Sequence, residues 1–122
     1  MNEFYPEIIL SGKKFSPRYL KERYNLNIEH ENEVGEFNPH LRRTYSIGYG
    51  ILRPKTGKTD ISVISELLDD YMKIINDNSL LIEDRQFHIY VETTQGNLSL
   101  NSDILQKVSM LFSSLELTVV ER

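Results

Sequence analysis

Three side chains of types that do chemistry stand two residues apart in the last third of the chain: His88, Tyr90 and Glu92. The residues between them, Ile89 and Val91, are apolar, and such alternation predicts a strand with the three polar side chains on one face. A histidine and a carboxylate can exchange protons with a substrate, and a tyrosine can orient it. An open sheet face in solvent carries the same residue types routinely. The pattern therefore leaves two interpretations open, a ligand-binding or enzyme site and an ordinary polar face.

A second candidate is Gly57-Lys58-Thr59, which precedes a predicted helix as the end of a phosphate-binding loop does. The full motif requires another glycine five residues before Gly57, so that backbone amides surround the phosphates, and Leu52 occupies that position. Pro54 also lacks an amide donor. We therefore predict a solvated loop here and expect no cofactor.

Histidine and glutamate residues gather in the polar stretch between residues 27 and 43. Metal sites hold their ligands at short, fixed spacings, such as two histidines four residues apart on a helix. Here the two histidines are ten residues apart in an irregular stretch, so an acidic solvated loop is predicted and no metal site. The chain has no cysteine, which excludes disulfides, thiolate zinc sites and a cysteine nucleophile. The candidate metal ligands are His30, Glu31, Glu33, Glu36 and His40.

Charge is distributed unevenly along the chain, with a net charge of +2 over residues 1–60 and −6 over residues 61–122, together the −4 of the whole chain. An acidic half argues against general nucleic-acid binding, which requires clustered cations, and permits a basic partner. A carboxylate near a helix C-terminus opposes the helix dipole, so attraction to a cationic partner would explain Asp77 better than stability does. The acidic residues proposed to contact a partner are Asp69, Asp70, Asp77, Glu83 and Asp84.

Length and composition predict a single domain over residues 1–122. The chain is 39% hydrophobic and 26% charged, an ordinary globular balance. The first seven residues show no secretory signal, and no apolar run approaches the length that spans a membrane. We expect a soluble cytoplasmic protein that binds no membrane.

Hydrophobic periodicity predicts the elements that position these residues. Strands are expected over residues 8–10, 44–52, 86–93 and 117–120, and residues 27–43 form a long loop with one edge strand. Helices are expected from Ser16-Pro17 to about residue 25, from an Asp60 cap to about residue 75, and from a cap at Asn101 or Ser102. The second helix carries apolar residues at helical spacing, namely Ile61, Ile64, Leu67, Leu68, Tyr71, Met72 and Ile75.

This order of elements predicts an α+β fold. The strands alternate strongly, so one sheet face is apolar and the other largely polar. The expected architecture is a two-layer sandwich with helices packed on one face of a mostly antiparallel or mixed sheet of about four to five strands. The strand over residues 44–52 is expected to place its tyrosines and isoleucines on one face. Its small residues, Ser46, Gly48 and Gly50, then form a shallow floor beside His88 if that face is open.

The C-terminal quarter reads Gly96-Asn97-Leu98-Ser99-Leu100, then Asp103 to Val108 in the pattern D-x-L-x-x-V, then Leu115-Glu116-Leu117-Thr118-Val119. This order of turn, helix and final strand resembles the end of the small bacterial proteins grouped as domain of unknown function 4279. Phe15-Ser16-Pro17 resembles the cap of that family's first helix, and Tyr45 stands where the family often has tryptophan. The resemblance implies a bacterial α+β domain and carries over no catalytic residue.

Size, acidity and the absence of a catalytic motif together favour a binding protein over an enzyme. The leading hypothesis is a bacterial immunity-type inhibitor, a monomer or weak dimer whose acidic surface covers a basic toxin domain. The alternative is a small-ligand-binding or enzymatic domain that uses the face bearing His88, Tyr90 and Glu92.

Overall fold

A computed structural model describes residues 2–94 and 98–122, which form an α+β domain with a five-stranded mixed sheet, three α-helices and a small two-stranded sheet. The predicted fold class is confirmed. The turn expected at residues 95–97 lies outside the described residues. In chain order the elements are β1 (Asn2–Gly12), α1 (Pro17–Arg23), β2 (Asn27–Asn32), β3 (Phe37–Asn38), β4 (Arg43–Thr44), β5 (Gly48–Arg53), α2 (Ser62–Met72), the 3-10 helix η1 (Asn78–Leu80), β6 (Asp84–Thr93), α3 (Ser102–Leu111) and β7 (Ser114–Glu121).

The first strand lies in the middle of the large sheet, whose strand order is β2-β5-β1-β6-β7. Strand β1 pairs antiparallel with β5 and with β6, β2 pairs antiparallel with β5, and β7 runs parallel to β6. Pairing with β6 extends along almost all of β1, whereas pairing with β5 begins only at Ile8. On the β5 side, the residues of β1 before Ile8 have no strand beside them, and the loop after β5 runs there instead. In this loop the Thr59 carbonyl accepts the Phe4 amide at 2.7 Å.

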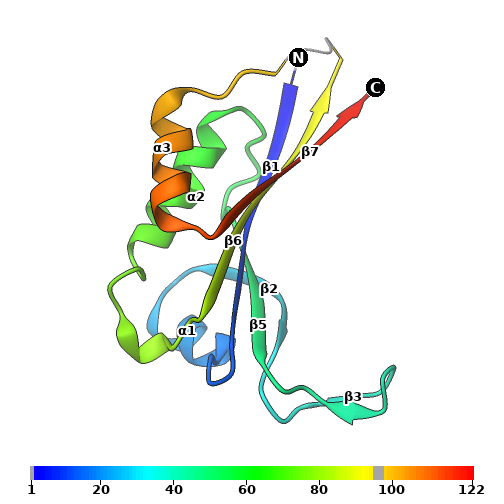
Figure 1. Ribbon diagram of the computed structural model, residues 1–122. Helices are drawn as coiled ribbons and strands as arrows, with labels where there is room; N and C mark the ends of the chain where they lie inside the picture. Colours follow the sequence, from blue (N-terminus) through cyan, green and yellow to red (C-terminus); the bar gives the residue numbers. More distant parts are fainter. Residues whose placement is uncertain (1, 95–97) are drawn as a thin grey trace.

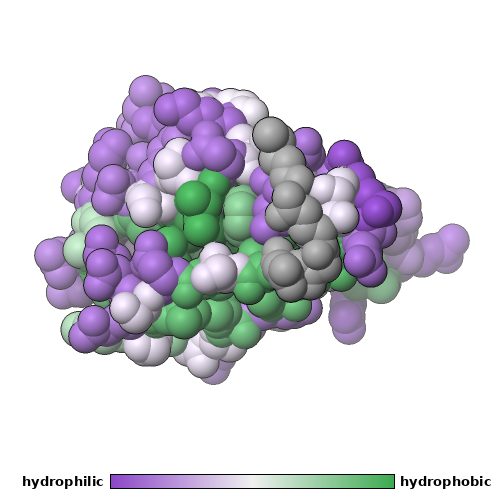
Figure 2. Space-filling view, turned by 90° about the horizontal axis from the view of Figure 1, so that it is seen from above, coloured by the Kyte–Doolittle hydropathy of each residue, from purple (hydrophilic) through white to green (hydrophobic). Residues whose placement is uncertain are grey.

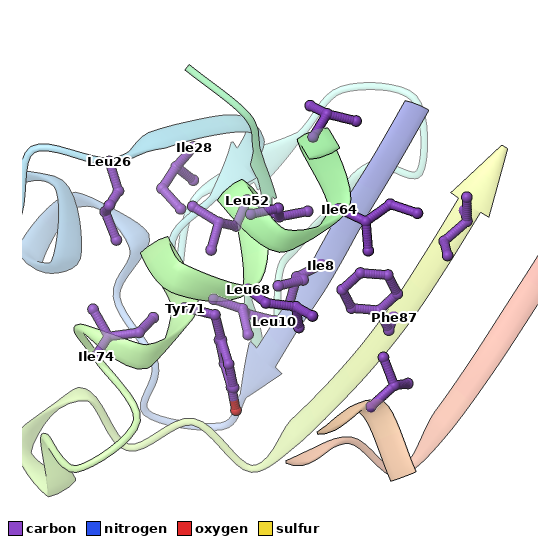
Figure 3. Close-up of a cluster of buried hydrophobic side chains, with 14 of the residues drawn as sticks. Ile8, Leu10, Leu26, Ile28, Leu52, Ile64, Leu68, Tyr71, Ile74 and Phe87 are labelled. Carbon is purple, nitrogen blue, oxygen red and sulfur yellow. The ribbon is translucent and has the colours of Figure 1, made fainter. Parts of the chain in front are cut away.

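Helices α2 and α3 pack on one face of the sheet (Figure 1). Between them and the strands lies a cluster of buried apolar side chains that includes Ile8, Leu68 and Phe87 (Figure 3). The Phe112 ring closes this cluster against Tyr71, at 4.6 Å between ring centroids, and against Phe87, at 5.1 Å. None of the described helices covers the opposite face of the sheet, which is called the open face below (Figure 1).

The predicted caps of the first and third α-helices are confirmed. The Ser16 hydroxyl accepts the Tyr19 amide at 3.1 Å and Pro17 occupies the first turn of α1. The Asn101 side chain accepts the Ile104 amide at 2.9 Å at the start of α3. Helix α1 ends at Arg23, slightly earlier than expected.

Strand β5 corrects the predicted assignment of faces. Gly48 and Gly50 lie on the helix-covered face, while Tyr49 and Ile51 lie on the open face. The reason is steric, since a Cβ at Gly48 would overlap the Phe15 carbonyl oxygen, and one at Gly50 would lie 2.9 Å from an Ile28 methyl carbon. The predicted small-residue floor on the open face is therefore wrong, and Ser46 lies outside the strand altogether.

Helix α2 begins at Ser62, two residues after the predicted cap, although the Asp60 carboxylate does accept the Ser62 amide at 2.9 Å. Its predicted buried face is confirmed at Ile64, Leu67, Leu68 and Tyr71. Ile61 and Met72 were expected on that face but are exposed, and Val63 is buried instead. The helix ends at Met72 rather than near residue 75, so Ile74, which is buried, and Ile75, which is partly buried, follow it.

The stretch of residues 27–43 holds more regular structure than expected. Strand β2 forms one edge of the large sheet, and β3 and β4 pair antiparallel in a small hairpin. Strands β1 and β7 are also longer than predicted, because the prediction rested on their most apolar residues alone. No helix within residues 2–94 and 98–122 is long and apolar enough to cross a bilayer.

The buried face of α2 yields a stability prediction. Leu68 is 2% exposed, so Leu68→Ala should lower the free energy of unfolding by about 2–5 kcal/mol through lost contacts and a residual cavity. Met72→Ala in the same helix is the matched control, because Met72 is 51% exposed and should change stability by less than about 0.5 kcal/mol. Urea denaturation followed by circular dichroism measures both, and equal effects of the two substitutions would contradict the assigned helix face.

Candidate functional site on the open sheet face

A chain of hydrogen-bonded side chains crosses the open face, and each strand of the sheet contributes one residue to it. In spatial order its members, called the cross-sheet network below, are Glu29 of β2, Arg53 of β5, Glu7 of β1, His88 of β6 and Thr118 of β7. Strand alternation places all five side chains on the same face. The register of the strands also places neighbouring members of the network side by side. Glu7 and His88, for example, are direct cross-strand partners.

Arg53 joins the three strands on one side of the network. Its Nη1 donates to Glu29 Oε2 at 2.6 Å, and its Nη2 and Nε donate to Glu7 Oε2 at 2.9 and 3.2 Å. Burial lowers the pKa of Arg53, but the hydrogen bonds that it donates to Glu29 and Glu7 outweigh burial, and the pKa lies above its ordinary value. The guanidinium therefore stays charged and its three nitrogens are all engaged.

His88 continues the network across the other two strands. Its Nδ1 lies 3.0 Å from Glu7 Oε1 and its Nε2 lies 3.1 Å from Thr118 Oγ1. Burial raises the pKa of Glu7, but hydrogen bonds from His88 and Arg53 outweigh it, so the pKa lies below its ordinary value of 4.5. An ionised carboxylate only accepts hydrogen bonds, so Nδ1 carries the proton of the Glu7–His88 contact.

A hollow of about 540 Å³ lies beside this network, within the size range of small-molecule sites. It forms where β5 ends at Arg53, so that the N-terminal half of β1 faces a loop rather than a strand. The Tyr5 and Tyr90 rings line it, with centroids 6.0 Å apart and planes at 55°. The other lining residues are Phe4, Pro6, Glu7, Asn27, Glu29, Arg53, Pro54, Thr56, Gly57, Lys58, Thr59, Val63 and His88.

The charges around the hollow differ in how far they are neutralised. Arg53 pairs with both Glu7 and Glu29, so its charge balances one of the two carboxylates and these three groups carry a formal charge of −1. The Lys58 ammonium lines the hollow and makes no hydrogen bond or ion pair within the described residues. The hollow therefore has apolar walls, two tyrosine rings and one cation, Lys58, that can form an ion pair with a ligand.

The structure partly confirms the residues that the sequence indicated on this face. His88, Tyr90 and Glu92 do share it, and the first two line the hollow. Glu92 does not line the hollow and instead forms an ion pair with Arg122. The loop with Gly57-Lys58-Thr59 was predicted only to be solvated, yet it forms one wall.

Sequence reasoning missed the residues of β1 that complete the site. Glu3, Tyr5 and Glu7 alternate with Phe4 and Pro6, both of which are buried. That alternation was the available signal, and it was overlooked because the strand was predicted to begin only at residue 8.

The acidic residues proposed for partner contact are mostly engaged within the chain. Asp70 is buried and its Oδ1 lies 3.2 Å from Lys73 Nζ. The Glu83 carboxylate accepts the Lys13 amide. Asp84 accepts hydrogen bonds from Gln86 and Ser113, both at 3.0 Å, whereas Asp69 is exposed. Partner binding by these residues stays a prediction.

Asp77 has a structural role that the sequence analysis missed. It is not at the end of α2 but caps η1, where its Oδ1 accepts the Ser79 amide at 3.0 Å and its Oδ2 accepts the Tyr24 hydroxyl at 2.6 Å. Hydrogen bonds from Ser79 and Tyr24 lower the pKa of Asp77. The argument that stability does not explain this residue is therefore wrong.

The candidate metal ligands of residues 27–43 do not assemble. Within the part of the chain that the structure describes, no group of three or more histidine and acidic side chains is placed to hold a metal ion. Glu33 accepts the Arg18 amide at 3.1 Å and the Ser16 hydroxyl instead. The absence of a bound metal and of a cofactor stays a prediction.

Comparison of the chain with protein-family models, curated proteins and solved structures finds no match. The resemblance to domain of unknown function 4279 therefore stays a prediction. Function must be argued from the site itself.

The Glu7 carboxylate makes stability depend on pH. A carboxyl group whose pKa is lower in the folded state stabilises the fold above its unfolded pKa, and this stabilisation is lost as pH falls through the folded pKa. The free energy of unfolding should therefore fall as the pH drops below the ordinary carboxyl pKa of 4.5 and through the lower folded pKa of Glu7. Glu7→Gln should cost about 1–3 kcal/mol at pH 7 and flatten the decline.

Denaturant unfolding at a series of pH values measures this effect. Glu22→Gln is the matched control, since Glu22 is exposed and makes no hydrogen bond or ion pair within the described residues. If Glu7→Gln keeps the full pH dependence seen with the control, the network does not hold an ionised Glu7.

Proposed function

We propose that this chain is a non-enzymatic binding protein that holds a small ligand in the hollow on the open sheet face. The observation that carries the proposal is a hollow of about 540 Å³ with two tyrosine rings beside a network of paired polar groups. Binding sites for small molecules are typically concave and mostly apolar, with a few placed polar groups.

The network itself argues for binding rather than catalysis. A general acid or base must reach the proton that it transfers to or from a substrate. Both ring nitrogens of His88 already have partners, and Glu7 accepts from His88 and Arg53 together. These groups therefore serve to fix the shape of the site.

The lining indicates the class of ligand. Tyr5 and Tyr90 offer aromatic faces and edges, and the hollow extends past β1 to the apolar side chains of Phe4 and Val63. Lys58 is the cation with capacity to pair with a ligand anion. A small, flat molecule that carries one anionic group matches these features.

The rival function, an immunity-type inhibitor with an acidic contact surface, has weaker support. Four of its five proposed contact residues have partners inside the chain: Asp70, Asp77, Glu83 and Asp84. A protein partner that covered the open face would use the tyrosines instead, and would protect the same hollow from a small probe.

A titration with 2-naphthoate, followed by amide resonances in solution, tests the proposal. Resonances of residues that line the hollow should shift on binding, and the neutral analogue 2-naphthamide should bind more weakly. Lys58→Ala should weaken naphthoate binding by roughly fivefold to tenfold. Lys55→Ala is the matched control, because Lys55 is exposed in the same loop but does not line the hollow.

The outcomes separate the parts of the proposal. Shifts confined to other surfaces would refute the hollow as the site. Equal binding of the acid and the amide, unchanged by Lys58→Ala, would remove the anionic group from the ligand class.

A further inference from the structure

The edge strand β7 carries apolar side chains that the rest of the fold leaves exposed. Leu115, Leu117 and Val119 are 39%, 42% and 48% exposed. Their register partners on β6 are buried in the core, so these side chains point to the helix-covered side, which the helices leave partly uncovered at this edge. Figure 2 looks onto the end of the molecule where β6 and β7 end and shows hydrophobic surface on its helix side. The register partners are Phe87, Ile89 and Val91.

The two edges of the sheet differ in how they resist pairing with another strand. Edge strands are normally protected by bulges, prolines or charged residues, above all lysine. Strand β2 has such protection, with a register shift between Glu29 and Asn32 and with His30 at a φ of 51°. Strand β7 pairs with β6 in unbroken register from Ser114 to Glu121 and contains no proline and no lysine.

We propose that a second copy of this chain covers this edge, with the two β7 strands pairing antiparallel about a two-fold axis at Leu117. An isologous contact of this kind requires a strand that is complementary to itself. In this register Leu117 lies opposite Leu117 of the second copy, and Leu115 lies opposite Val119. The apolar row then continues across both strands.

Other registers fit worse, because they place like charges, or an apolar and a charged residue, directly opposite each other. An axis at Glu116 would place two carboxylates directly opposite each other, which destabilises strand pairing. An axis at Thr118 would place Leu115 opposite Glu121, and an axis at Val119 would place Leu117 opposite Glu121. The axis at Leu117 is the one that keeps all three apolar residues matched without opposing like charges.

The second copy would also add a residue to the cross-sheet network. With the axis at Leu117, Glu116 of the second copy lies opposite Thr118 on the open face, where side chains of facing residues are within reach of each other. The Thr118 hydroxyl has a single proton, so it can donate to that carboxylate only when His88 Nε2 donates to Thr118, which requires protons on both ring nitrogens of His88. In that state of His88, dimerisation would extend the network of one copy into the other.

Sedimentation velocity over a concentration series tests the proposal on the full chain. The wild type should approach twice the chain mass of 14.3 kDa as its concentration rises. Leu117→Lys places two cations at the axis and should raise the dissociation constant by at least about tenfold. Val34→Lys is the matched control, since Val34 is 47% exposed and lies outside β7. Circular dichroism verifies that both variants remain folded.

A cysteine cross-link tests the register, because the chain has no cysteine of its own. Under mild oxidation, Leu117→Cys should form a covalent dimer and Val34→Cys should not. A wild type that stays monomeric at the highest concentration overturns the proposal, as does a dimer that Leu117→Lys leaves intact. Failure of Leu117→Cys to cross-link a wild-type-like dimer overturns the proposed axis. These outcomes are independent of whether the hollow binds naphthoate.

Discussion

The placement of Arg53 between Glu7 and Glu29 is the constraint on which the open face depends. An exposed ion pair contributes only about 0–1 kcal/mol, but this guanidinium is partly buried and bonds two carboxylates from two neighbouring strands. Without it, Glu7 and Glu29 would stand on either side of β5 with no compensating charge. Because Arg53 holds Glu7, it also fixes the carboxylate that orients His88, and His88 in turn reaches Thr118.

The end of β5 at Arg53 explains why the hollow lies where it does. A sheet face is flat as long as its strands continue side by side. Here β1 continues beyond the last residue of its neighbour, and the following loop turns along its side instead. Pro54 directly follows Arg53, and a residue without an amide donor cannot extend the ladder. One residue therefore ends the strand pairing at the point where the hollow begins.

The sequence predicted those features that depend on local periodicity and failed where packing decides. The alternation in β6 correctly placed Phe87 in the core and His88 on the open face. The same reasoning assigned β5 to the wrong face, because the close approach of Phe15 to Gly48 involves segments that are distant in sequence. The cross-sheet network could not be predicted at all, since its five members come from five strands and the strand order was unknown.

The central position of β1 has a consequence for how the protein folds. Strand β1 lies far in sequence from both of its partners, since it pairs with β5 from Gly48 onward and with β6 up to Thr93. Until these partners are in place, the apolar side chains of Ile8 and Leu10 have no sheet to join. Contacts between residues so far apart in sequence also close slowly. The central sheet of this domain therefore forms only when segments about 40 to 90 residues apart in sequence come together, and a chain that lacks β6 leaves one side of β1 without a partner.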